Sequence, residues 1–93
     1  ITSLPIPIKA GHYNMEISAR GYPARNIFPH LKVYVNDNQI GDFFVSESLQ
    51  QKNLDFEIKS QTNVIIKIEM DNDLSDATGD RNAFIKKIII SKK

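Results

Sequence analysis

The sequence predicts an all-β protein, a single β-sandwich of jelly-roll type with roughly seven to nine short antiparallel strands. Hydrophobic residues recur at every second position along most of the chain, which is the period of a strand with one buried face. Turn-forming residues separate these segments at short intervals. The chain has 93 residues, 41% of them hydrophobic, so we expect one domain spanning residues 1–93 with a single core.

Four segments carry the alternation most clearly. In each segment the apolar residues are expected to face the core, and the polar residues between them are expected to face water. The apolar positions are Tyr13, Met15, Ile17 and Ala19; Leu31, Val33 and Val35; Leu54, Phe56 and Ile58; and Val64, Ile66, Ile68 and Met70.

Two further segments contain residues that disturb a regular strand. Pro5 and Pro7 limit residues 4–9 to an extended or edge position, because proline cannot donate a hydrogen bond to a neighbouring strand. Residues 40–45 are mostly apolar, and Gly41 interrupts them. A glycine inside a strand predicts a bulge or a bend at that point.

The end of the chain and the turns complete the pattern. In the isoleucine-rich segment 83–91 the alternation slips at Lys86-Lys87, which predicts a bulge there. The run Asn36-Asp37-Asn38 predicts a tight hairpin, because Asn and Asp tolerate the left-handed conformations that such turns require. Residues 46–51 are the single helical candidate, and they are too short to form a stable element unless they pack.

Charge and composition exclude several classes of function. Lys and Arg number 12 against 11 for Asp and Glu, so the net charge of +1 predicts neither a nucleic acid nor a membrane partner. The absence of Cys excludes disulfides, thiolate metal sites and Cys nucleophiles. The longest apolar run, Ile88-Ile89-Ile90, is too short to span a bilayer. Because the chain begins at Ile1, we expect a processed protein or a domain of a longer one.

The loop of residues 71–82 has the composition of a cation site. Its carboxylates repel one another, so the loop favours a bound cation or wide solvation. Because the donors are all hard oxygens, calcium suits them better than zinc, and Gly79 would let the backbone fold closely around an ion. The donor side chains are those of Asp71, Asn72, Asp73, Asp76, Asp80 and Asn82.

This loop does not follow the EF-hand pattern. Asp76 stands where an EF-hand requires Gly, and Asn82 stands where it requires a bidentate Glu. A simpler interpretation also stays open. Loops rich in Asp and Asn often stabilise themselves through hydrogen bonds from side chain to backbone, and Asp80 and Arg81 could be solvated or paired with each other.

Several motifs resemble those of the small calcium-dependent carbohydrate-binding modules, most closely the xylan-binding type. The most specific is the C-terminal pattern, in which an Asn-Asp pair ends a strand and Gly-Asp-Arg-Asn opens the last one. Weaker similarity covers most of the remaining chain. The matching residues are Asn72-Asp73, Gly79-Asp80-Arg81-Asn82 and Phe84-Ile85, with Ile17-Ser18-Ala19-Arg20-Gly21, Pro29-His30-Leu31-Lys32-Val33-Tyr34-Val35 and Gly41 upstream.

The resemblance implies a jelly-roll sandwich in which a loop-bound Ca²⁺ coordinates vicinal sugar hydroxyls. By position, Asp73 and Asp80 would be carboxylate ligands, and backbone carbonyls near Leu74 and Gly79 would complete part of the shell. The resemblance further implies that Asn82 ligates the ion or pins the loop, and that Arg81 pairs with a carboxylate or donates to a sugar oxygen. The family pattern does not require the weaker candidates Asp71 and Asp76.

The sequence departs from the family at two points. Members often have an Asp and an aromatic residue where this chain has Lys86-Lys87, and the chain lacks Trp altogether. Calcium affinity would be weaker or lost if that Asp contributes to the ion site.

Other residues are secondary candidates. Tyr22 and Phe28 would stack on a sugar ring if they are exposed, or close the end of the core if they are not. Tyr34 on the wet face of its strand could support such a platform, but it is rather expected to be an ordinary cross-strand partner. We expect no metal or catalytic role for His12 or His30, because no Ser or Cys motif accompanies them. The lysines Lys86, Lys87, Lys92 and Lys93 are expected to be solvated and to protect strand edges.

Together these observations favour a monomeric, non-catalytic, lectin-like module that binds a xylan-like or related polysaccharide with Ca²⁺ as cofactor. It would target attached catalytic or surface domains of a larger, secreted or cell-surface bacterial protein to a glycan. The alternative is a structural or adhesion β-sandwich whose acidic loop binds calcium only for stability, or binds nothing. An enzyme is disfavoured, because glycoside hydrolysis needs two carboxylates facing each other across a cleft rather than sharing one loop.

Overall fold

The computed structural model describes residues 1–76 and 79–93. Ala77 and Thr78 of the acidic loop, together with the side chains of Ser75 and Asp76, lie outside the described residues. The described ranges contain no helix, and therefore no helix able to cross a membrane. Their strands are β1 (Ile6–Ile8), β2 (Gly11–Tyr22), β3 (His30–Val35), β4 (Asn38–Phe44), β5 (Gln50–Ile58), β6 (Thr62–Val64), β7 (Ile66–Met70), β8 (Ser75–Asp76), β9 (Gly79–Asp80) and β10 (Asn82–Lys92).

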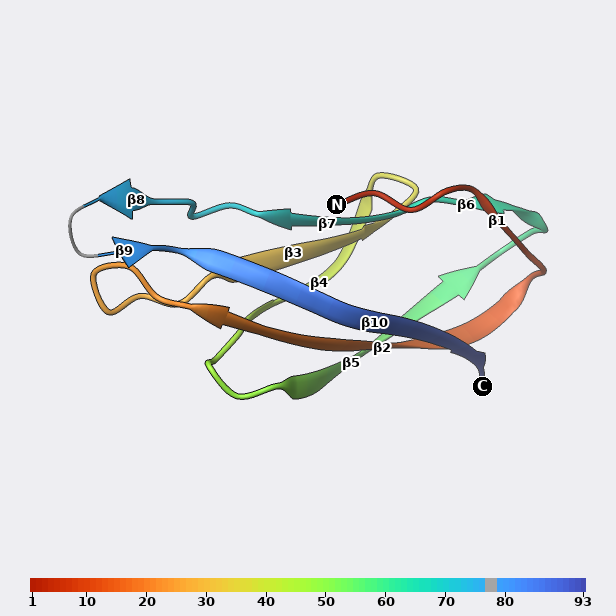
Figure 1. The fold of residues 1–93 in the computed structure, drawn as a ribbon. Helices are drawn as coiled ribbons and strands as arrows, with labels where there is room; N and C mark the ends of the chain where they lie inside the picture. The colour runs from red at the N-terminus through yellow and green to blue at the C-terminus, as the bar shows by residue number, and fades with distance from the viewer. Residues whose placement is uncertain (77–78) are drawn as a thin grey trace.

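The predicted all-β sandwich is confirmed. Two antiparallel three-stranded sheets form its layers, sheet I in the order β10-β2-β5 and sheet II in the order β4-β3-β7 (Figure 1). The N-terminal segment extends sheet II at one edge, because β1 pairs with β6 and Thr2 forms a bridge with Lys67. The chain passes from one sheet to the other after β2, β4, β5 and β7, as it does in jelly-roll and Greek-key sandwiches.

The core lies between the two sheets and follows the predicted alternation. Tyr13, Met15, Ile17 and Ala19 of β2 are all buried, and so are the alternate residues of β3. In β5 and β7 the outermost apolar positions, Leu54 and Met70, are only partly buried. Burying apolar area contributes about 25 cal/mol per Å², so this shared core is the main term that holds the two sheets together.

The predicted turn and bulges are present. Asn36 and Asp37 have φ values of 49° and 66° and form a two-residue hairpin between β3 and β4. The β3–β4 register shifts beside Gly41, which leaves Ile40 as the extra residue. A second shift, between Ile85 and Lys87, confirms the bulge predicted in the last strand.

The helical candidate was wrong, since residues 46–49 form no regular element and β5 begins at Gln50. The bulge in β10 has a clear effect on packing. Because two residues oppose one at this point, Ile85 and Ile88 both pack against the core.

The molecule is elongated, with extents of 48 × 21 × 17 Å along its principal axes. At one end, which we call the loop end, lie β8, β9 and the loop of residues 23–29 (Figure 1, left). At the opposite end, which we call the far end, β2 begins and β10 finishes.

Candidate functional site

The acidic loop projects from the loop end of the sandwich. It leaves sheet II at the end of β7, forms the short β8–β9 hairpin, and enters sheet I at the start of β10 (Figure 1). The end of β2 lies beside the start of β10, because Tyr22 pairs with Asn82. The loop therefore joins the two sheets at the same end as the 23–29 loop.

A buried arginine holds these two loops together. The Arg81 side chain is 6% exposed. Its Nε donates to the carbonyl of Ile27 at 2.9 Å and its Nη2 donates to that of Ala24 at 2.8 Å, while Nη1 donates to the carbonyl of Asn72. A guanidinium is a planar fork of donors, which suits several carbonyls converging on one point. Arg81 thus fixes the backbone of the acidic loop.

The turn that Arg81 holds is itself tightly folded. Ala24 and Ile27 exchange two backbone hydrogen bonds of 3.1 and 3.0 Å. Between them Arg25 and Asn26 have φ values of 51° and 63°, as in a tight hairpin turn. The guanidinium therefore binds to a rigid acceptor rather than to a loose segment.

Asn72 makes a second connection across the loop end. Its Oδ1 accepts the backbone N–H of His30 at 2.9 Å, and its Nδ2 donates to the carbonyl of Phe28 at 3.0 Å. The side-chain amide therefore pairs with the entry to β3 much as another strand would. The loop backbone is held by hydrogen bonds from side chain to backbone, as one of the two interpretations of this sequence expects.

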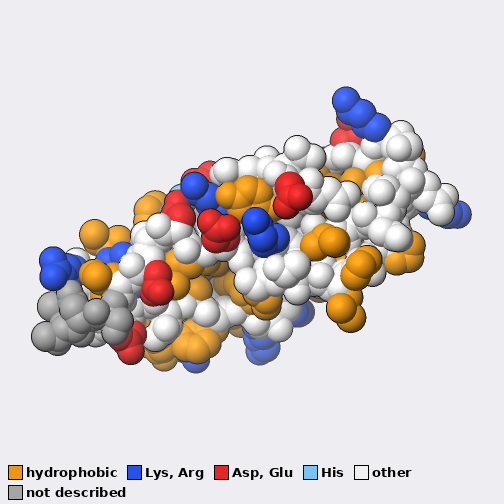
Figure 2. Space-filling model, turned by 90° about the horizontal axis from the view of Figure 1, so that it is seen from above, with side chains coloured by type: hydrophobic (Ala, Val, Ile, Leu, Met, Phe, Trp, Pro, Cys, Tyr) orange, Lys and Arg blue, Asp and Glu red, His pale blue; other side chains and the backbone are white. Residues whose placement is uncertain are grey.

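His30 lies between two carboxylates on the outer face of sheet II. Its Nδ1 is 2.8 Å from Oδ1 of Asp71, and its Nε2 is 2.7 Å from Oδ2 of Asp42. Lys32 lies 3.4 Å from the other oxygen of Asp71, and the Phe44 ring is stacked at a tilt on the imidazole with centroids 4.7 Å apart. Acidic and basic side chains are interspersed over the face seen from above (Figure 2).

These contacts favour the charged forms of both partners. The hydrogen bonds to Asp71 and then to Asp42 raise the pKa of His30 above its usual value. The hydrogen bond from His30 lowers the pKa of Asp71, burial opposes this shift, and the contact with Lys32 adds a smaller lowering. The two ring nitrogens point in opposite directions, so the carboxylates lie on opposite sides of the ring and cannot share an ion with it.

The predicted ligands do not form one cluster. Asp73 and Asp80 are both exposed, and Asn82 is exposed opposite Tyr22. The carbonyl of Leu74 accepts the backbone N–H of Arg81 at 2.8 Å. In the β8–β9 hairpin Asp80 pairs with Ser75, and Asp76 pairs with Gly79 through its backbone.

Gly79 has a φ of 141°, a conformation that L side chains rarely adopt, so this position requires glycine for the hairpin itself. Asp71, a weaker candidate ligand, lies at the end of β7 and pairs with His30 instead.

The donor chemistry suits calcium, but the geometry restricts where an ion could bind. Among the described side chains, which are those of residues 1–74 and 79–93, no three His, Cys, Asp or Glu are grouped so that they could hold a metal. The buried Arg81 guanidinium repels a cation from the interior of the loop end, and it already binds the carbonyl of Asn72 in the acidic loop and those of Ala24 and Ile27 in the 23–29 loop. An ion would therefore have to bind on the solvent side, where Asp73 and Asp80 are exposed.

The two aromatic candidates differ in exposure. Tyr22 is 42% exposed at the end of β2, whereas Phe28 is only half-buried beside the buried Pro29. Tyr34 lies under the ammonium of Lys67, 4.7 Å from ring centroid to Nζ. Tyr22 is thus the better placed of the two predicted stacking residues.

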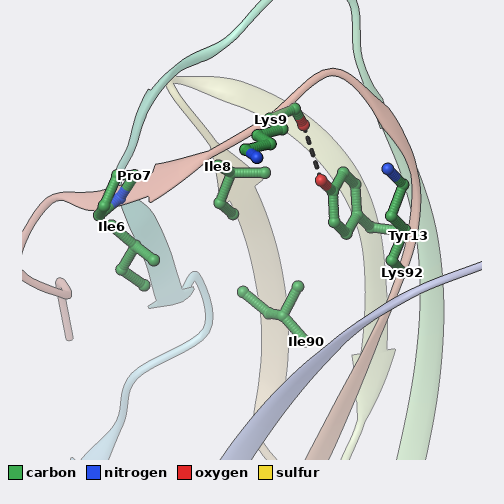
Figure 3. Close-up of a pocket in the computed structure, with 7 residues that line it drawn as sticks. All are labelled: Ile6, Pro7, Ile8, Lys9, Tyr13, Ile90 and Lys92. Atoms are coloured by element: carbon green, nitrogen blue, oxygen red, sulfur yellow. Dashed lines mark hydrogen bonds between the residues drawn. The ribbon is translucent and has the colours of Figure 1, made fainter.

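The far end has a hollow of different character. Its volume is about 320 Å³, and its walls come from β1, β2 and β10, including Ile8, Tyr13 and Ile90 (Figure 3). The Tyr13 hydroxyl donates to the carbonyl of Lys9 at 2.7 Å. The lining contains no carboxylate, imidazole or serine hydroxyl, and its titratable side chains are those of Lys9, Tyr13 and Lys92.

Two features of the site were missed from sequence. The imidazole–carboxylate contacts were missed because residues 30, 42 and 71 come together only once strand register is known. The clue was available, since His30 begins one strand and Asp71 ends a candidate partner strand. The role of Arg81 as a donor to three carbonyls has no comparable clue in the sequence.

Comparisons with known proteins add no assignment. A scan against models of protein families, a search among curated proteins and a search among solved structures each found no match. The resemblance to calcium-dependent carbohydrate-binding modules therefore stays a prediction from the motifs of the sequence.

Proposed function

We propose that this domain is a non-catalytic module that binds polysaccharide at the loop end of its sandwich, with calcium held by the acidic loop. One observation carries the proposal. Arg81 and Asn72 hold the backbone near the two ends of the loop through carbonyl and amide contacts, and Asp73 and Asp80 of this loop are both exposed. Exposed carboxylates next to backbone that is held in place suit a hard cation.

The residues have distinct parts in this proposal. Asp73 and Asp80 would hold the ion, with Asn82 and loop carbonyls as further oxygen donors. When bound, calcium supplies coordination positions at which sugar hydroxyls can replace water. Arg81 holds the loop and takes no direct part, because its nitrogens already donate to carbonyls. Tyr22, exposed beside Asn82, would stack against a sugar ring.

The biological role follows from small, shallow contacts. A site of this size buries little area, so single-site affinity would be modest. Attached to a larger extracellular bacterial protein, the module would raise the local concentration of its neighbours on a xylan-like glycan.

The test is retention on insoluble xylan, with calcium and then with excess chelator. We expect calcium-dependent retention that Asp73→Ala and Asp80→Ala each abolish. Glu57→Ala is the matched control, because it removes one carboxylate at the far end, 3.4 Å from the imidazole of the exposed His12. If neither excess chelator nor the Asp73→Ala and Asp80→Ala substitutions reduce retention, the calcium mechanism is contradicted. Release of reducing sugar would contradict the non-catalytic assignment.

One observation favours a second candidate. The Arg81 guanidinium is a cation that already holds the acidic loop to the 23–29 loop, so no metal is needed to join them. The domain would then be a structural or adhesion β-sandwich whose acidic loop binds calcium only for stability, or binds nothing. Such a protein would be retained on no polysaccharide in either buffer.

A further inference from the structure

The outer face of sheet I carries an aromatic pair with an arginine beside it. Tyr22 on β2 and Phe84 on β10 meet edge to face with centroids 5.9 Å apart, and they are 42% and 46% exposed. The Arg20 guanidinium lies 5.5 Å from the first ring centre and 5.4 Å from the second, and its Nη1 donates to the Tyr22 hydroxyl at 3.0 Å. The two rings therefore hold the guanidinium in a fixed orientation.

The charges on this face are divided along its length. No carboxylate of the described residues forms an ion pair with Arg20, and the exposed Lys86 and Lys87 follow Phe84 along β10. The carboxylates of the same sheet, on Glu16, Asp55 and Glu57, lie farther toward the far end. Glu16 is four residues from Arg20 along β2, about 13 Å at the rise of a strand. The strands of this half thus present Arg20, Lys86 and Lys87, and the carboxylates of Glu47 and Asp80 belong to the adjoining loops.

We propose that this half of the face binds a carboxylated pyranose, a uronate unit of an acidic polysaccharide. One ring face of the sugar would pack on Tyr22 and Phe84. The Arg20 guanidinium uses one N–H to donate to the Tyr22 hydroxyl. Its remaining N–H groups can donate to both oxygens of a carboxylate. The inference rests on the proposed function, since it gives the substrate class for a glycan-binding module.

The same surface chemistry could attract a single-stranded nucleic acid, which also binds aromatic rings and cations. The observations favour the sugar. Three cations and a net charge of +1 for the whole chain give no continuous basic path along which a phosphate backbone could lie.

The test is calorimetric titration with hexagalacturonic acid in the presence of chelator, so that the calcium loop takes no part. We expect binding that Phe84→Ala and Arg20→Gln each weaken by about tenfold or more, as the loss of a charged hydrogen bond or a stacking ring predicts. Lys9→Gln removes one positive charge at the far end and is the matched control, and Asp73→Ala leaves the carboxylate site intact. Both are expected to bind as the wild type does. Circular dichroism checks that each variant is folded.

Four results would overturn the inference. Hexagalacturonic acid could fail to bind in chelator, or Arg20→Gln could bind as Lys9→Gln does. Xylohexaose or a sulfated oligosaccharide could bind as tightly, which would remove the preference for a carboxylate. An oligonucleotide could bind more tightly. Each result is separate from calcium-dependent retention on xylan, so failure here and failure of the proposed function are distinguishable.

Discussion

Arg81 is the residue on which the loop end depends most. A buried cation is expensive unless its donors are satisfied, and here they meet the carbonyls of Ala24, Ile27 and Asn72. Those carbonyls come from two loops that are far apart in the sequence. The charge is therefore used to join backbone segments rather than to pair with a carboxylate.

Replacing Arg81 should reduce the stability of the whole domain. Arg81→Met removes three hydrogen bonds from a charged donor to backbone carbonyls, and we expect a loss on the order of 3 kcal/mol in the free energy of unfolding. Arg81→Lys keeps the charge but cannot reach three acceptors, so it should lose most of the same stability. Urea denaturation measures both. A stability of Arg81→Lys equal to that of the wild type would show that the charge matters and the fork does not.

His30 makes stability depend on pH in a defined window. Its folded pKa lies above the ordinary 6.5, so its contribution is fully present below pH 6.5 and is lost as pH rises through the folded value. The folded pKa of Asp71 lies below 3.8, so its contribution is present above pH 3.8 and is lost as pH falls. The pair therefore stabilises most between about pH 4 and 6.5.

Comparison with His30→Gln isolates this effect, because other titrating groups are common to both proteins. We expect the stability difference between wild type and variant to be largest at pH 5 to 6 and to shrink toward pH 8. Thermal unfolding across this range measures it. A difference independent of pH would mean that the imidazole contributes packing against Phe44 and no charge.

At the scale of elements, β10 shows how an edge strand is protected. It is an outer strand of sheet I and lies next to β2. The backbone groups along its other edge could pair with a strand of another chain. The bulge between Ile85 and Lys87 and the lysines along it, Lys86, Lys87 and Lys92, oppose such pairing. The sequence predicted both the bulge and the protective lysines from local features alone.

Gly21 is required where β2, β10 and two loops converge. A Cβ there would meet the backbone oxygen of Asn82, with Val45 Cγ2 at 2.7 Å and Pro29 Cγ at 3.0 Å. We expect Gly21→Ala to destabilise the domain by about 2 kcal/mol, since neither a backbone oxygen nor a proline can move aside cheaply.

Gly41→Ala is the control for that prediction. Its Cβ would meet mainly Leu54 Cδ2 at 2.6 Å, the flexible end of a side chain that can rotate. The melting temperature should therefore fall clearly less for Gly41→Ala than for Gly21→Ala. Equal losses would mean that the close approach at Gly21 is not what requires glycine.

How far the sequence predicts this protein depends on the range of the interactions involved. Strands, the Asn36-Asp37 hairpin and both bulges were predictable because alternation and turn chemistry are local. The pairing of His30 with Asp71 needs strand register, and the position of Arg81 needs the three-dimensional path of two loops. Long-range contacts of polar side chains leave no period in the sequence.

At the scale of the whole molecule, calcium should stabilise the fold if the acidic loop binds it. A ligand that binds only the folded state at a hundredfold its Kd adds about 2.7 kcal/mol. For a domain of this size that corresponds to a rise of more than about 10 °C in Tm. Thermal unfolding with calcium and with chelator measures it, and Asp73→Ala should abolish the rise. An unchanged Tm would favour the interpretation in which Arg81 makes the loop independent of metal.

The central claim is that a glycan binds at the loop end, and mapping amide chemical shifts tests it most directly. The protein would be labelled with ¹⁵N and titrated with xylohexaose in calcium and then in chelator. We expect that in calcium the amides of Tyr22, Gly79, Asp80 and Arg81 shift, and that chelator reverses the change. Shifts confined to the far end, around Ile8, Tyr13 and Ile90, or no shifts in either buffer, would contradict it.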